Sequence, residues 1–465
     1  MTKIALTNPY AQIVKDQRTY FETLNTRALD GRKTSLKHLA HAIKKYKQEI
    51  FSAIQADFSK PSVEILGSEY AAVLEDIEFA IDNLDQWAAT TPAPTSILHF
   101  HSTSRIERHP LGVVLVIAPW NYPFLLAVSP LVAAIAAGNT VILKPSELTQ
   151  NTSKIIETII AEAFPQHLAT TVLGGPEQTQ ALLNEKFDHI FFTGGATVAK
   201  EIYKRAAEHL TPVTLELGGK SPAIVTNNCD LEIAARRIAW GKFYNAGQTC
   251  VAPDYVLVPT ERKVLFIQKM IEQIKIFYGP SINTQRSVDY ARIINERHTN
   301  RLIELLKDQT IAFGGTYDVK ERFLSPTIVD SPNLESQLMT EEIFGPILPV
   351  LGYKSLDDAL EIVRKNPQPL ALYLFTNDES EEQRVGQEIQ FGGGCINDCL
   401  IHLSNPHLPF GGVGSSGFGN YHGRFGFETF SQKRAILKKT NLFDVKIRYA
   451  PYTETKSKIL KTLLK

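Results

Sequence analysis

Short apolar segments alternate with longer amphipathic segments through most of the chain. The run GVVLVIA at 112–118 is apolar throughout, which is typical of a strand buried on both faces of a parallel sheet. Further strands are predicted at 140–143, 170–173, 189–193 and 213–217, with helices between them at 124–137, 149–164, 176–184 and 196–209. This alternation predicts βαβ units and a doubly wound parallel sheet of the α/β class.

A second α/β series begins near residue 222. Its strands are predicted at 223–226, 255–258, 347–351, 371–375 and 394–396, and its helices at 231–243, 262–277, 356–365 and 381–389. The first hundred residues differ, because apolar positions recur there at helical spacing and a Pro-containing break precedes an extended excursion at 96–108. We therefore expect two α/β domains and a small extra element.

Composition narrows the class of protein. The 465 residues are 43% hydrophobic and 21% charged, which excludes a disordered tail protein, a collagen and a coiled coil. Lys and Arg total 49, as do Asp and Glu, so the formal net charge of zero argues against a nucleic-acid partner. The N-terminus has no export signal, and no apolar run reaches the ~18 residues of a membrane helix. We expect a soluble cytoplasmic protein.

Four cysteines are too few for a disulfide scaffold and fit a reducing compartment. Cys250 lies in NAGQTCVAP at 245–253, a loop whose access makes the thiol a candidate nucleophile, although a packed cysteine is the commoner case. Cys229, Cys395 and Cys399 are assigned to packing. The C-x3-C spacing of the last two, near His402, suggests a metal site only weakly, because Cys395 is predicted to lie in a buried strand.

Two polar residues follow predicted strands. Glu216 in VTLELGG ends a strand before two glycines, where a carboxylate can act as a general base, and the alternative is a solvent-facing Glu. Asn121 in APWNYP lies between two prolines, where a rigidly held amide N–H is a good oxyanion donor, and the alternative is a turn-forming Asn.

Two further segments are candidates for binding a dinucleotide. Lys144 and Glu147 in ILKPSE lie where an adenosine ribose binds in a doubly wound domain, or they form a surface ion pair. Gly194 and Gly195 in FTGGATVAK would let a diphosphate approach backbone N–H groups at a helix start, or they form a plain turn. No GxGxxG follows the first strand, so the usual dinucleotide fingerprint is absent.

Taken together, these segments resemble the NAD(P)-dependent aldehyde dehydrogenase superfamily from about Phe21 to Lys439. The specific motifs are PWNYP at 119–123, LELGGKSP at 215–222, GQTCVAP at 247–253 and EEIFGP at 341–346. The segment LPFGGVGSSGFGNYHGRFGFETFS at 408–431 is similar to the class 3 branch, which handles medium- and long-chain aliphatic and aromatic aldehydes.

The resemblance implies a role for each motif residue. Cys250 would attack the aldehyde as a thiolate, and the Asn121 side-chain amide with the Cys250 backbone N–H would hold the oxyanion. Glu216 would activate water to hydrolyse the thioester, which favours acid formation over transfer to CoA. The cofactor would be NAD, with NADP as an alternative, and no metal is implied. The implied cofactor-binding residues are Trp120, Lys144, Glu147, Gly194, Gly195, Leu217, Glu342 and Phe344.

The chain departs from the family at the phosphate turn. The second glycine of that turn is replaced by Ala199, and Gly195 stands where Ser or Asn is common, so backbone N–H groups must suffice for the phosphates. This departure concerns cofactor affinity and leaves the implied reaction type unchanged.

The resemblance also implies the domain organisation. We expect a Rossmann-like NAD-binding domain at 1–90 and 108–216, an α/β catalytic domain at 217–397, a small β bridging and oligomerisation element at 91–107 and 398–440, and a tail at 441–465. Members with this arrangement pair as homodimers. In the tail, 456–465 has four lysines beside an apolar stripe, which favours a frayed helix or a dimer contact, with weak binding to an anionic membrane surface as the alternative.

Two rival functions stay open at this point. One is a semialdehyde or phosphorylated-aldehyde oxidoreductase of the same superfamily, against which the class 3-like segment argues. The other is a non-catalytic binding protein that has kept the fold, which need not retain Cys250, Glu216 and Asn121 together.

Overall fold

The computed structural model describes residues 8–96, 99–279, 284–442, 444 and 446–463. It divides into a larger unit, residues 1–87 and 110–431, and a smaller one, residues 88–109 and 432–465. Both predicted α/β series lie in the larger unit, and the finer division into a cofactor domain and a catalytic domain stays a prediction.

The first series forms a sheet whose strand order is β17-β7-β6-β3-β4-β5. Its strands are β3 Val113–Ile117, β4 Thr140–Lys144, β5 Ala169–Thr171, β6 His189–Thr193, β7 Val213–Glu216 and the antiparallel edge strand β17 Gly417–Phe418. The strands β3 and β4 are buried along their whole length, as their apolar runs predict. The strand order reverses at β3, so the predicted doubly wound parallel sheet is confirmed, with one added antiparallel edge strand.

Helices cover both faces of this sheet. On one face, α1 Ala11–Glu22, α8 Pro176–Leu183 and α9 Ala196–Glu208 contribute to one apolar cluster with β3 and β6. On the other face, α6 Leu125–Ala137 packs on β3 and β4, with α7 Gln150–Ala163, α2 Leu29–Lys45 and α3 Lys47–Phe58 beside it. The chain then passes through α4 Ser62–Ile65, a π-helical turn at Leu66–Ala71 and α5 Ala72–Ala88.

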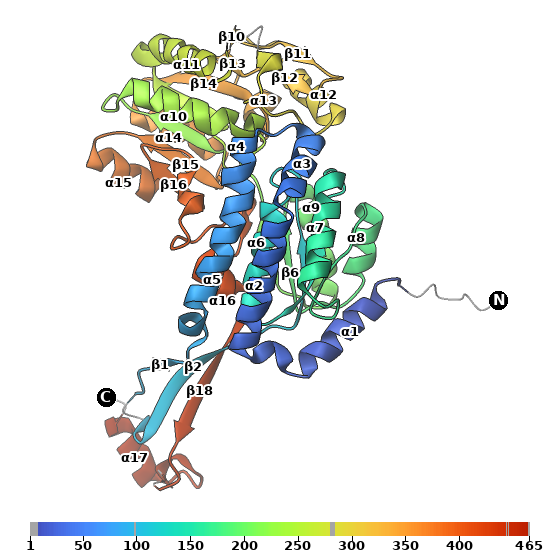
Figure 1. Ribbon diagram of the computed structural model, residues 1–465. Coiled ribbons are helices and arrows are strands. Elements are labelled where there is room, and N and C mark those ends of the chain that lie inside the picture. Colours follow the sequence, from blue (N-terminus) through green and yellow to red (C-terminus); the bar gives the residue numbers. More distant parts are fainter. Residues whose placement is uncertain (1–7, 97–98, 280–283, 443, 445, 464–465) are drawn as a thin grey trace, which may run out of the picture. The chain divides into compact units, whose positions relative to one another are not determined.

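The second series forms a sheet in the order β10-β13-β14-β9-β8-β15-β16. Its strands are β8 Pro222–Val225, β9 Tyr255–Pro259, β10 Ile311–Phe313, β13 Thr327–Asp330, β14 Ile347–Tyr353, β15 Ala371–Phe375 and β16 Gly393–Ile396. Its helices are α10 Leu231–Phe243, α11 Lys263–Tyr278, α12 Glu296–Leu305, α13 Gln337–Thr340, α14 Leu356–Lys365 and α15 Glu379–Glu388. A later helix, α16 Gly423–Thr429, packs on α6 of the first series. The helices α10 and α11 lie side by side over this sheet (Figure 1).

The sequence analysis did not assign the elements between 284 and 340. These include β10, β13, α12, α13 and the two-residue strands β11 Tyr317–Asp318 and β12 Phe323–Leu324. Strands of two or three residues are too short to show a period of two, so hydrophobic patterning gives no signal for β10, β11 and β12.

The smaller unit is a three-stranded sheet in the order β1-β2-β18, followed by a terminal helix. Its elements are β1 Thr91–Ala93, β2 Ser102–Pro110, β18 Ser431–Lys439 and α17 Glu454–Leu463. The predicted extended excursion near residue 100 is confirmed by β2. No described helix combines the length and the apolar character needed to cross a bilayer.

Candidate active site

Cys250 and Glu216, the two reactive residues expected from the sequence, line one cavity of about 530 Å³. Glu216 is the last residue of β7, and Cys250 follows a tight turn after α10. Glu216 lies at the carboxyl end of its strand, where parallel α/β sheets place their ligands, whereas Cys250 reaches the cavity from the loop that precedes β9 Tyr255–Pro259. Cys250 is partly exposed in this cavity, which agrees with the access expected for a nucleophile.

Glu216 is only 2% exposed, so the alternative of a solvent-facing carboxylate is wrong. Neither carboxyl oxygen has a hydrogen-bond partner among the described residues, although both are buried. Burial raises the pKa of Glu216 well above its ordinary value. A buried carboxyl with free lone pairs that faces a cavity is suited to accept a proton from a water molecule there.

The thiol of Cys250 is also held in its protonated form. Burial raises its pKa to about 12, and the nearby carboxyls of Glu342 and Glu216 raise it further. The backbone N–H groups of Cys250 and Val251 act in the opposite direction. The thiol therefore needs a proton acceptor, or a change in the surrounding charge, before it can act as a nucleophile.

Asn121 lies beside the cysteine loop, at the end of β3. It is 3% exposed, and its Nδ2 donates to the backbone oxygen of Gln248 at 3.0 Å, two residues before Cys250. A primary amide has two N–H donors, so one remains for an oxyanion. The two segments therefore meet, while the donor role of Asn121 stays a prediction.

Most of the cavity wall comes from residues that the sequence motifs do not include. The apolar part of the wall is formed by Tyr122, Leu125, Leu126, Trp240, Tyr244, Val251, Leu370, Leu400, Ile401, Leu403, Phe410 and Tyr421. Phe410 and Tyr421 are fixed by two backbone hydrogen bonds at 3.1 and 2.8 Å and by ring contact. Four acidic residues of α5 complete the wall, and burial raises the pKa of one of them, Asp76, to about 6.

Four of the expected cofactor residues are Trp120, Phe344, Glu342 and Leu217, and of these Leu217 lines the cavity itself. The rings of Trp120 and Phe344 meet edge to face with centroids 5.3 Å apart. The Glu342 carboxyl occupies the space that a Cβ on Gly218 would need. Burial and the charge of Asp254 raise the pKa of Glu342 to about 8. The Glu342 carboxyl in turn raises the pKa of the Cys250 thiol. Leu217 lines the cavity beside Glu216 and is buried.

Lys144 is the last residue of β4, and Glu147 follows three residues later. Lys144 is 2% exposed, and its Nζ donates to the Pro145 carbonyl at 2.8 Å and lies 3.6 Å from Glu147 Oε2. Burial lowers the pKa of Lys144. Glu147 is exposed, so its carboxylate is free to accept hydrogen bonds from ribose hydroxyls.

The glycine pair after β6 leaves an open helix start. Gly194 donates its N–H to the Glu216 carbonyl at 3.0 Å, and Gly195 is the exposed N-cap of α9 with no side-chain cap. No heavy atom lies within 4 Å of a Cβ built on Gly195. The uncapped N–H groups and this free space fit a diphosphate. Ala199 lies on the buried face of α9, in the apolar core, so its side chain does not obstruct the start of this helix.

The other cysteines differ from Cys250. Cys229 and Cys399 are buried, in line with packing. The prediction that Cys395 lies in a buried strand is wrong, because β16 is an edge strand and the thiol is partly exposed, 3.4 Å from His402 Nδ1. Among the described residues, no group of three or more His, Cys, Asp and Glu side chains is arranged to hold a metal ion.

Comparison with known proteins identifies the family of the chain. The model of the aldehyde dehydrogenase family matches residues 5–436. The 4,4'-diaponeurosporen-aldehyde dehydrogenase of Staphylococcus aureus is 45% identical over 97% of this chain and 98% of its own length. Aldehyde dehydrogenase family 3 member A2 of Mus musculus is 45% identical over 94% of this chain and 91% of its own. The dimeric NADP-preferring aldehyde dehydrogenase of Canis lupus familiaris is 43% identical over 95% and 97%.

Solved structures show the same fold. The substrate-bound state of Staphylococcus aureus AldH matches with a TM-score of 0.95 and 45% identity, covering 98% of this chain and 99% of that one. An indole-3-acetaldehyde dehydrogenase in complex with NAD+ matches with a TM-score of 0.83 and 26% identity, covering 92% and 88%. The chain therefore belongs to the aldehyde dehydrogenase family, as an oxidoreductase of class 3 type that acts on aldehydes.

Proposed function

We propose that this enzyme oxidises a hydrophobic aliphatic or aromatic aldehyde to its carboxylic acid with NAD. The observation that carries the proposal is the meeting of Cys250 and Glu216 in one cavity whose walls are largely apolar. A small polar semialdehyde would leave the apolar walls exposed to water, whereas an extended apolar chain would bury them and bind more tightly.

The reaction begins when Cys250, having lost its thiol proton to solvent, forms a bond through its thiolate sulfur to the aldehyde carbon. The carbonyl oxygen becomes an oxyanion, which the Asn121 amide and the Cys250 backbone N–H stabilise, and one such donor contributes about 3 kcal/mol to lowering a barrier. The chemistry that NAD supplies when bound is acceptance of hydride from the thiohemiacetal carbon. The oxyanion then returns its electron pair to carbon, and a thioester remains on Cys250.

Hydrolysis of the thioester is the task of Glu216. Its unpartnered oxygens take a proton from water as the water oxygen bonds to the acyl carbon, and the carbon–sulfur bond then breaks to release the acid and the thiolate. Glu216 and Cys250, whose pKa values are both raised, are the groups that gain and lose protons, which is typical of an active site.

The residues around the sheet edge support NAD as the cofactor. Gly194, Gly195 and the start of α9 would receive the diphosphate, and Lys144 with Glu147 the adenosine ribose. Glu342 would bind the nicotinamide ribose, with Phe344, Trp120 and Leu217 around the nicotinamide end. The exposed carboxylate of Glu147 disfavours the 2′-phosphate of NADP by charge repulsion, and NADP stays as a weaker alternative.

A chain-length series tests the substrate class. With purified enzyme and NAD, kcat/KM should rise from butanal to dodecanal by up to about fourfold per added CH2 until the cavity is filled, because each buried CH2 contributes ~0.8 kcal/mol. NADH formation measured at 340 nm reports the rate, and Cys250→Ala should abolish it. A flat series, or a preference for succinate semialdehyde, would overturn the hydrophobic substrate.

The proposal extends to assembly and location. We expect a cytoplasmic homodimer formed through the β1-β2-β18 sheet, in which β18 is an edge strand able to pair with another copy.

The terminal helix is expected to be a frayed end or a dimer contact. One of its lysines, Lys456, is engaged within the chain, because its Nζ donates to the carbonyls of Tyr449 and Pro451. The weak membrane alternative depends partly on Leu464 and Lys465, which lie outside the described residues. Equal binding of anionic vesicles by the full chain and by a chain lacking 456–465 would reject that alternative.

A further inference from the structure

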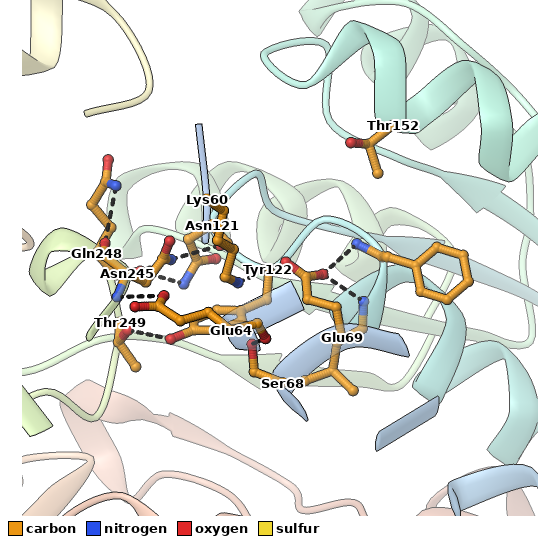
Figure 2. Close-up of polar contacts among 12 residues, drawn as sticks. Lys60, Glu64, Ser68, Glu69, Asn121, Tyr122, Thr152, Asn245, Gln248 and Thr249 are labelled. Carbon is orange, nitrogen blue, oxygen red and sulfur yellow. Dashed lines mark hydrogen bonds and ion pairs between the residues drawn. The ribbon is translucent and has the colours of Figure 1, made fainter. Parts of the chain in front are cut away.

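A buried polar network lies beside the cysteine loop, and its charged members lie outside every motif of the sequence (Figure 2). Its charged members are Lys60 before α4, Glu64 within α4 and Glu69 in the π-helical turn. Their exposures are 1%, 8% and 0%. Burying three charged groups is costly unless each finds partners, so their contacts indicate what they hold in place.

The Lys60–Glu69 ion pair anchors the segment that carries Asn121. Lys60 Nζ lies 2.7 Å from Glu69 Oε1, and the other oxygen of Glu69 accepts the N–H groups of Phe124 and Leu125 at 3.0 and 3.2 Å. These are the first N–H groups of α6, so Glu69 fixes the chain directly after Asn121 and Tyr122. Lys60 Nζ also lies 3.7 Å from the centroid of the Tyr122 ring, in a cation–π contact.

Glu64 holds the other segment, the turn that leads to Cys250. Its Oε2 accepts the N–H of Asn245 at 3.0 Å. Asn245, Ala246 and Gly247 have φ values of +52°, +51° and +73°, a left-handed run that is strained at the alanine. Burial raises the pKa of Glu64 to about 7, while Lys60 and the Asn245 N–H act to lower it. A strained turn persists only where its surroundings fix it, and Glu64 supplies one such contact.

Short hydrogen bonds join the two held segments (Figure 2). Asn245 Nδ2 donates to the Asn121 carbonyl at 2.8 Å, and Asn121 Nδ2 donates to the Gln248 carbonyl at 3.0 Å. The hydroxyls of Tyr122 and Thr249 lie 2.6 Å apart. The residues on either side of this junction are Asn121 and Cys250, the two that the proposed function places around the oxyanion.

We propose that Glu64, supported by the Lys60–Glu69 ion pair, is a positioning residue that sets the Asn121 amide against the Cys250 backbone N–H. It touches neither substrate nor cofactor and acts through the Asn245 turn. The inference rests on the proposed function, in which Asn121 is an oxyanion donor. Two donors on separate segments stabilise one oxygen only if the segments keep a fixed spacing, because hydrogen-bond strength falls steeply with misalignment.

A double-mutant cycle tests this role. Asn121→Ala should lower kcat/KM for a medium-chain aldehyde by about 10²–10³-fold, the usual effect of losing an oxyanion donor. Glu64→Ala should lower it 10–100-fold, and the double variant should fall no more than threefold below Asn121→Ala, because Glu64 acts through Asn121. Glu49→Ala, an exposed glutamate of α3, is the matched control and should retain wild-type kcat/KM.

Alkylation of Cys250 by iodoacetamide separates positioning from general loosening. That reaction forms no oxyanion, so Glu64→Ala should alkylate within twofold of wild type even while kcat/KM falls. Equal losses in alkylation and kcat/KM, or additive effects in the cycle, would overturn the positioning role. A harmless Glu64→Ala beside a damaging Asn121→Ala overturns this inference alone, whereas a harmless Asn121→Ala overturns the oxyanion role in the proposed function and this inference with it.

Two conservative variants keep the test decisive if Glu64→Ala is insoluble. Glu64→Gln retains an acceptor at the same reach, so kcat/KM should stay within fivefold of wild type. Glu64→Asp retains the charge but is one methylene shorter, so kcat/KM should fall at least tenfold. Equal kcat/KM in the Gln and Asp variants would show that the reach of the acceptor does not matter, and the inference would fail.

Discussion

The two sides of the catalytic cysteine are built differently. On the substrate side, Glu64, Asn121 and Tyr122 hold the loop before Cys250 through buried hydrogen bonds of 2.6–3.0 Å (Figure 2). On the cofactor side, Gly195 and Glu147 are exposed, and the N-terminus of α9 has no side-chain cap. The substrate side is preorganised, because its hydrogen bonds are formed before any ligand binds. The cofactor side leaves backbone N–H donors free for a ligand to use.

Electrostatics follow the same division. The pKa values of Glu216, Glu342 and Cys250 are all raised, and burial is the largest cause for each. Such shifts disfavour charge on these three groups, which suits an apolar substrate beside them. The reactive groups therefore lie on the buried side, and the groups that would bind a charged cofactor lie on the open side.

Removing the base on the buried side should have the largest effect. Glu216→Gln keeps the shape but takes away the proton acceptor for water, so the steady-state rate should fall about 10²–10⁴-fold. Formation of the thioester does not need this base, so rapid-mixing experiments should still show one NADH per active site in the first turnover. The measurement is a stopped-flow trace at 340 nm followed to steady state.

The control for this variant is Cys250→Ala, which should lose both the burst and the steady state. An unchanged steady-state rate in Glu216→Gln would remove this residue from the mechanism. Loss of the burst together with the steady state would assign Glu216 to thiol activation instead of thioester hydrolysis.

The titration of Cys250 should give the next largest effect. Because the pKa of the thiol is raised to about 12, only the small thiolate fraction reacts near neutrality, and that fraction grows tenfold per pH unit. Alkylation of the enzyme without cofactor should therefore speed up about 100-fold from pH 7 to pH 9 with no plateau. Mass spectrometry of the Cys250 peptide measures it without interference from Cys395.

Glu342→Gln sharpens this measurement. The Glu342 carboxyl has a pKa of about 8, so it is largely ionised at pH 9 and opposes the thiolate. Removing its charge should lower the pKa of Cys250 and speed alkylation several-fold at pH 9, with less effect at pH 7. A plateau in the alkylation rate below pH 8 in the wild type would show a stable thiolate and would contradict the raised pKa of Cys250.

The same division explains what the sequence could predict. Cys250, Glu216 and Asn121 lie in local motifs at strand ends or loops, where chain geometry brings them together whatever the details of packing. Glu64 is 181 positions from its partner Asn245, and no period or motif links the two. Hydrophobic patterning gives the α/β class and most strands, yet the position of a strand within its sheet is a tertiary property. Cys395 was therefore misplaced, because nothing local marks β16 as an edge.

Adjacent glycines on the open side should show the smallest effects and separate folding from binding. A Cβ on Gly195 meets nothing within 4 Å, and its backbone angles of −79° and 147° suit alanine, so Gly195→Ala should unfold at the wild-type temperature. A Cβ on Gly194 would lie 2.5 Å from the Phe192 ring, so Gly194→Ala should lose about 1–3 kcal/mol of stability. If the diphosphate approaches this turn, Gly195→Ala should weaken NAD binding three- to tenfold in a fluorescence titration. Unchanged affinity in that variant would place the diphosphate elsewhere, and the open side would then lack the function that its free donors suggest.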